Sequence, residues 1–220
     1  MATVKARLAT GLVVGDAGQP VTENHLRQLM NPISVRTFSK LEYRDPRPIL
    51  VRLRQLELEL SASATPHPIR NLRTNRLKPE RESREAAIFC YLVGQRIGTR
   101  VGVAFGEVQE FDFVITWCHK ELTLFAPVQL KELPPETTAP EASVHDIICV
   151  LVKYVSSPEM IVAIHLNRTI TFDLATIVVP SLPIAELWAF GATSASQNSW
   201  ALWGDLLHSP TVSNHSYPAD

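Results

Sequence analysis

The stretch FDFVITWCHKELTLFAPVQLKEL, residues 111–133, decides the fold that the sequence predicts. Two apolar runs, FDFVITW and LTLFAPVQLKEL, are separated by the polar segment CHKE, which is typical of two antiparallel strands joined by a turn. Three polar side chains interrupt these runs: Asp112 in the first, and Gln129 and Lys131 in the second. Because residues two apart on a strand share a face, Gln129 and Lys131 point the same way. The spacing allows Asp112 to meet this pair at one end of a sheet.

The segments around this pair of strands predict an alternation of helices and strands. Residues 79–98 have apolar side chains at helical spacing after a proline, which predicts a helix. RVGVAFGEV, residues 100–108, predicts a short strand. EASVHDIICVLVKYV, residues 141–155, predicts a helix with a broad apolar face, and MIVAIHLN, residues 160–167, a buried strand. The predicted order is therefore helix, three strands, helix and strand.

The two ends of the chain carry weaker patterns. Residues 1–78 predict a strand-containing extension that packs on the core. Within it, residues 49–63 alternate apolar and polar side chains with one slip, which favours a long bulged strand, and a helix is the alternative. Near the other end, residues 186–192 predict a strand and residues 196–210 a capped helix. We expect residues 209–220 to form a disordered tail.

The order of elements, with Asp112 in the second strand and Gln129-Leu130-Lys131 in the third, resembles the PD-(D/E)XK superfamily of restriction-endonuclease-like nucleases. The resemblance covers about residues 80–170. It implies an α/β fold with a mixed central sheet flanked by helices, and an αβββαβ core within a domain at residues 79–208. The sequence departs from the superfamily at Gln129, where a carboxylate is usual. The function that the resemblance implies is metal-dependent hydrolysis of DNA phosphodiester bonds, by an endo- or exodeoxyribonuclease.

Four residues would carry the chemistry: Asp112, Gln129, Lys131 and Glu85. Phosphodiester hydrolysis uses a divalent ion that polarises the phosphoryl oxygen, and Mg²⁺ prefers oxygen ligands. We expect Asp112 and Gln129 to hold Mg²⁺ or Mn²⁺ through a carboxylate and a carbonyl oxygen. Lys131 would orient the attacking water or stabilise developing negative charge. The superfamily often has a further acid on its first helix, and Glu85 is the candidate here.

A basic segment precedes the predicted first helix and continues into it. Guanidinium and ammonium groups bind phosphates, and such contacts provide most of the sequence-independent affinity for DNA. The alternative is a solvated linker whose charges are balanced by neighbouring glutamates. The candidate DNA-binding residues are Arg70, Arg73, Arg76, Lys78 and Arg84.

Composition limits the other classes of function. The 220 residues carry a net charge of −1, so any attraction to nucleic acid must come from local clusters. No apolar run reaches the roughly 18 residues that span a bilayer, so we expect no membrane contact. The three widely spaced cysteines are typical of reduced thiols inside the cell, and we therefore expect a cytoplasmic protein. Walker-type, G-x-S-x-G and HExxH motifs are missing, which argues against an NTPase, an α/β-hydrolase and a zincin.

Two rival interpretations stay open beside the nuclease. In the first, Gln129 marks lost catalysis, and a degenerate nuclease fold binds DNA or a protein partner. In the second, the chain is an α/β protein that binds other partners and has no role with nucleic acid. DNA is the expected partner in the favoured interpretation, and a homodimer is left open.

Overall fold

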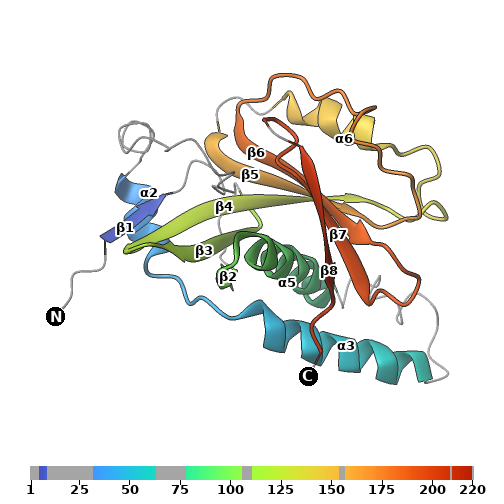
Figure 1. The fold of residues 1–220 in the computed structure, drawn as a ribbon, viewed down its shortest axis with the longest axis horizontal. Helices are drawn as coiled ribbons and strands as arrows, with labels where there is room; N and C mark the ends of the chain where they lie inside the picture. The colour runs from blue at the N-terminus through green and yellow to red at the C-terminus, as the bar shows by residue number, and fades with distance from the viewer. Residues whose placement is uncertain are drawn as a thin grey trace.

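The computed structural model describes residues 5–8, 32–62, 78–105, 111–153, 157–208 and 210–219. These residues form a mixed α/β fold in which an eight-stranded sheet has helices on both faces (Figure 1). The helices are α2 (Pro32–Phe38), α3 (Pro46–Ala62), α5 (Lys78–Ile97) and α6 (Val144–Leu151). The strands are β1 (Lys5–Leu8), β2 (Val101–Ala104), β3 (Phe113–His119), β4 (Leu122–Leu133), β5 (Ser157–Leu166), β6 (Ile184–Ala192), β7 (Ser199–Gly204) and β8 (Thr211–Ser216).

The sheet has the order β2-β3-β4-β5-β6-β7-β8, and β1 pairs with β4 off this path. Strands β2, β3 and β4 are antiparallel, β4, β5 and β6 are parallel, and β7 and β8 return to antiparallel pairing. The order predicted for the core, from α5 through β2, β3, β4 and α6 to β5, is confirmed.

Strand β4 changes partners along its length. It pairs with β3 from Leu122 to Val128 and with β5 from Val128 to Leu133. The two neighbours therefore separate near Val128, and the last part of β4 continues beside β5 alone. Asp112 and Gln129, two of the polar residues that the sequence analysis singled out, lie next to this point.

Helix α5 forms because its apolar residues recur at helical spacing, and Ala86, Phe89 and Val93 are all buried. It ends at Gly98, whose φ of 67° suits a residue without a side chain, and the N–H of Thr99 donates to the Gly94 carbonyl over 3.1 Å. The helix packs one face of the sheet, and α3 lies outside it (Figure 1).

The opposite face of the sheet carries a second core. Helix α6 begins with a capping box in which the Ser143 hydroxyl accepts from the Asp146 N–H and the Asp146 carboxylate accepts from the Ser143 N–H. Its buried residues Ile148 and Leu151 pack with Leu133 and Ile164 of the sheet. The central strands are therefore covered on both sides, as their nearly continuous apolar sequences require.

Residues 49–63 were expected to be a bulged strand, and that prediction is wrong, because residues 46–62 form helix α3. Leu50 and Leu53 lie one turn apart and are both buried, and Leu50 belongs to the core that contains α5. The helix is started by Asp45, whose carboxylate accepts the N–H of Arg47 over 2.9 Å. The alternation of leucines reflects a two-sided apolar helix, and the alternative named for this segment is confirmed.

The helix predicted for residues 196–210 is also wrong, since Ser199–Gly204 is strand β7. Trp200 and Leu202 are buried in the core of α5 and follow the period of two that a strand requires. The predicted disordered tail contains strand β8, which pairs with β7 from Thr211 to Ser216. Its side chains bury little, so backbone pairing rather than an apolar pattern defines it.

Among the described helices, none combines the length and apolarity needed to cross a membrane.

Candidate metal site at the ends of β4 and β5

Three ionisable side chains meet where α5 crosses the carboxyl ends of β4 and β5. Glu132 and His165 are direct partners in the parallel register of these strands. Glu85 reaches them from α5, and the ligand atoms of the three residues all lie within 4.8 Å of one another. Glu85 and His165 are each only 4% exposed. We call these three residues the Glu-Glu-His group.

Neighbouring side chains fix the orientation of the Glu-Glu-His group. Asn167 donates from Nδ2 to Oε1 of Glu132 over 2.7 Å. The His165 ring stacks on Phe190, with centroids 5.0 Å apart, and on Trp200 at 5.9 Å. Both the Glu132 carboxylate and the His165 imidazole are therefore held in place by contacts within the chain, as pre-organised metal ligands are.

The contact between Glu85 and His165 is close but incomplete. Nδ1 of His165 lies 3.2 Å from Oε1 of Glu85. The same nitrogen is buried and has no partner with hydrogen-bond geometry in the described part of the chain. A buried polar atom without a partner is costly, and here a cation between imidazole and carboxylates would satisfy it. The group could hold a metal ion.

Asp112 and Gln129, expected as metal ligands, do lie side by side, just outside the point where β3 and β4 separate. Gln129 donates from Nε2 to Oδ2 of Asp112, and the same oxygen accepts the N–H of Leu130 over 2.6 Å. Gln129 thus presents its nitrogen, not its carbonyl oxygen, to Asp112. The Asp112 carboxylate therefore accepts a backbone N–H of β4 just beyond the point where β4 stops pairing with β3.

Side chains of β4 point alternately to the two faces of the sheet, so Gln129 and Lys131 lie on one face and Glu132 on the other. Val128 and Leu130 pack in the hydrophobic core that contains α5. The intervening Gln129 therefore points to the other face of the sheet, as does Lys131. Glu132 shares the face of Val128 and Leu130, opposite to Lys131.

A cavity of about 380 Å³ nevertheless joins residues from both faces at this end of the sheet. Its lining includes Glu85, Asp112, Lys131 and Glu132. Three of the four predicted catalytic residues therefore line one cavity. The fourth, Gln129, is hydrogen-bonded to Asp112.

A larger cavity of about 650 Å³ lies on the other side of His165. It is lined by aromatic and polar side chains that include Trp200, Trp203, Asn167 and Arg84. Glu85 and Glu132 line the first cavity and His165 the second, so the Glu-Glu-His group stands between the two.

The predicted DNA-binding residues are found in different settings. Arg84 is buried, ion-pairs with Glu57 over 3.3 Å and donates to Oε1 of Gln197 over 2.6 Å, so its charge is balanced within the chain. Lys78 is exposed and lies 3.4 Å from Glu82. Arg70, Arg73 and Arg76 lie outside the described residues.

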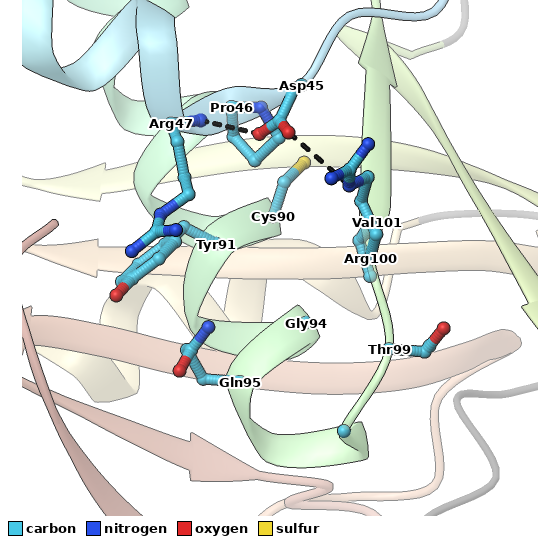
Figure 2. Close-up of a pocket in the computed structure, with 11 residues that line it drawn as sticks. Asp45, Pro46, Arg47, Cys90, Tyr91, Gly94, Gln95, Thr99, Arg100 and Val101 are labelled. Atoms are coloured by element: carbon cyan, nitrogen blue, oxygen red, sulfur yellow. Dashed lines mark hydrogen bonds and ion pairs between the residues drawn. The ribbon is translucent and has the colours of Figure 1, made fainter.

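A further cavity lies between the start of α3 and the end of α5 (Figure 2). Asp45 sits at its rim, where one carboxylate oxygen accepts the Arg47 N–H and the other pairs with Nε of Arg100 at 3.4 Å. Burial raises the pKa of the Cys90 thiol in its wall well above the ordinary range. The cysteine is therefore a protonated core residue and not a nucleophile.

Glu132 and His165 were not among the four residues that the sequence predicted for the chemistry, although it contains a signal for both. Each ends a run with period two whose other members are apolar: Val128 and Leu130 precede Glu132, and Ile161 and Ala163 precede His165. An ionisable residue on the buried face of a strand needs a partner or a ligand.

No protein-family model, curated protein or solved structure matches this chain.

Proposed function

We propose that the protein is a metal-dependent nuclease that hydrolyses DNA phosphodiester bonds on a restriction-endonuclease-like fold. The observation that carries the proposal is the Glu-Glu-His group beside a cavity that Asp112 and Lys131 also line. The topology supports it: an antiparallel β2-β3-β4 unit continues in parallel to β5, with α5 on one face and α6 on the other.

The side chains divide the work in this proposal. Glu85, Glu132 and His165 hold a divalent ion, which supplies Lewis-acid activation of the phosphoryl oxygen and of a bound water. Lys131 stabilises the negative charge that develops on the phosphate. Asp112 anchors the end of β4 through the N–H of Leu130 and presents a further carboxylate to the cavity beside those of Glu85 and Glu132.

The route for DNA is suggested by the start of α5. Residues 79–85 of this helix contribute Pro79, Arg81, Glu82, Ser83 and Glu85 to the cavity wall. The basic segment that contains Arg70, Arg73 and Arg76 runs directly into this helix along the chain. Such basic residues would add sequence-independent affinity for the DNA backbone.

The test is cleavage of supercoiled plasmid, linear duplex and single-stranded DNA by the purified chain with Mg²⁺ or Mn²⁺. Glu132→Gln and Lys131→Ala should each lower the cleavage rate by about 100-fold or more. Glu136→Gln is the matched control, because Glu136 is an exposed carboxylate just beyond β4, and it should cut like the parent.

Two results would overturn the nuclease. If the parent binds DNA in a gel-shift assay but cuts none of the substrates with either ion, the degenerate DNA-binding interpretation replaces it. If the parent neither cuts nor binds DNA, the fold serves another partner. Equal cleavage by parent and Glu132→Gln would place the chemistry elsewhere in the chain.

A further inference from the structure

We infer that the Glu-Glu-His group selects a first-row transition ion of the Mn²⁺ or Fe²⁺ type over Mg²⁺. The inference rests on the proposed function in taking this group as the ion site, and it adds which ion the site is built for. Its basis is the imidazole, since the sequence alone had pointed to oxygen ligands and hence to either Mg²⁺ or Mn²⁺ without a preference between them.

The geometry makes His165 a ligand rather than a bystander. Its ring packs beside both Phe190 and Trp200, whose centroids lie 6.4 Å from each other, and these contacts restrict how far it can turn away from the carboxylates. Nδ1 faces Oε1 of Glu85 at 3.2 Å without forming a hydrogen bond with it. This separation suits two ligand atoms that approach one ion from neighbouring positions.

The donor set then decides the ion. Mg²⁺ is hard, holds its waters and takes oxygen ligands, so a nitrogen donor contributes little to its binding. Manganese, iron and zinc ions accept carboxylate oxygen and imidazole nitrogen together. Three protein ligands also leave coordination positions for water and for a phosphate oxygen, as in catalytic sites.

Thiolates are the preferred ligands of zinc, and the chain has exposed candidates outside the site. Cys149 lies on α6 with its Sγ 3.3 Å from Nε2 of His145, and Cys118 is exposed on β3. Zn²⁺ is therefore a poor probe for the Glu-Glu-His group. Mn²⁺ avoids this competition because it favours oxygen and nitrogen over sulfur.

The experiment compares Mn²⁺ and Mg²⁺ binding to the metal-free full-length chain by calorimetry. Mn²⁺ should bind at least about tenfold more tightly than Mg²⁺. His165→Asp, which makes the donor set all oxygen, should reduce this preference by at least about tenfold. His119→Gln is the control, because His119 is exposed at the opposite end of the β3–β4 pair, and it should keep the preference.

A spectroscopic measurement adds a test that does not depend on whether His165→Asp folds, because the parent spectrum alone can contradict the inference. Electron spin-echo modulation of the Mn²⁺-loaded chain should show coupling to a directly bound nitrogen, and His165→Gln should lose it. Equal affinities for both ions in the parent, or a spectrum without nitrogen coupling, would overturn the inference.

The two proposals fail in different ways. Nitrogen-coupled, selective Mn²⁺ binding without cleavage of any DNA would support the metal site and overturn the nuclease. Cleavage supported equally by Mg²⁺ and Mn²⁺, with His165→Asp leaving the ratio unchanged, would support the nuclease and overturn the selectivity.

Discussion

Two polar groups at the same end of β4 differ in burial and in hydrogen bonding. Asp112 is exposed, and its Oδ2 accepts both the Gln129 amide and the Leu130 N–H. The Glu-Glu-His group is largely buried, and Nδ1 of His165 has no hydrogen-bond partner in the described ranges. The hydrogen bonds of the first group come from the chain itself, whereas the second group keeps a buried nitrogen that a cation could bind.

This difference shows why a carboxylate in the right motif position is not by itself an ion site. A carboxylate whose oxygen is occupied by backbone and amide donors must lose these bonds to bind an ion. A group whose buried nitrogen lacks a hydrogen-bond partner would lose no hydrogen bond at that atom by binding an ion. The predictions below test whether the two groups differ in function as they differ in structure.

The largest effect should come from replacing the Glu132 carboxylate with an amide, and the same exchange at Asp112 serves as the comparison. Glu132→Gln should lower Mn²⁺ affinity by more than about 100-fold, because replacing an anionic ligand with a neutral amide costs more than losing the hydrogen bond that orients it. Asp112→Asn, the matched exchange in the other group, should change the affinity far less. Calorimetry on both variants measures this, and an equal loss in both would restore Asp112 as the ligand that its sequence position predicts.

A smaller effect is expected from Asn167, which orients Glu132 through a hydrogen bond of 2.7 Å. Asn167→Ala should weaken Mn²⁺ binding by about 10-fold to 100-fold, the range for residues that orient metal ligands. Asn214→Ala provides the control, because Asn214 is exposed on the edge strand β8. If both variants bind Mn²⁺ like the parent, Asn167 does not support the site.

Replacing Asp112 should affect the stability of the fold rather than the affinity for metal. Asp112→Ala removes the acceptor of the Leu130 N–H, and we expect the free energy of unfolding to fall by about 1 kcal/mol. Urea denaturation measures the change. Glu136→Ala, at an exposed turn, should stay within about 0.5 kcal/mol of the parent. A loss for Asp112→Ala no larger than this control would mean that the cap contributes nothing.

The smallest effect concerns Asp146, a carboxylate satisfied locally like Asp112. Hydrogen bonds from the Ser143 hydroxyl and N–H lower the pKa of Asp146. Because the folded value is depressed, its stabilising contribution is present above the ordinary carboxyl pKa and is lost as the pH falls through the folded pKa. Ser143→Ala should raise the Asp146 pKa toward its ordinary value in an NMR titration. An unchanged pKa in this variant would contradict the assignment of the shift to the capping box.

Local patterns in the sequence were sufficient for much of the core. The run LTLFAPVQLKEL predicted β4 with its observed bounds, because alternation, β-branched and aromatic residues and a following proline pair all agree. Helices α5 and α6 were also predicted, since their apolar residues repeat at helical spacing and their first turns carry cap residues or prolines. Asp112 and Gln129 could be placed together because they lie on consecutive strands joined by a short turn.

The ends of the chain show where local pattern misleads. Leucines in α3 alternate like those of a strand, and the tryptophans of β7 are spaced in a way that also fits a helix. Only packing decides between these alternatives: α3 is a helix whose Leu50 is buried in the core that contains α5, and β7 is a strand because its backbone pairs with β6 and β8.

The sequence by itself determined the order of helices and strands from α5 to β5 and the meeting of Asp112 with Gln129. Only the tertiary structure decided that Glu85, Glu132 and His165 share a site. These three residues come from a helix and from two parallel strands whose crossover contains α6, so no local spacing relates them. Their contact depends on the strand register and on where α5 crosses the sheet, and both are set by the burial of apolar residues elsewhere in the core.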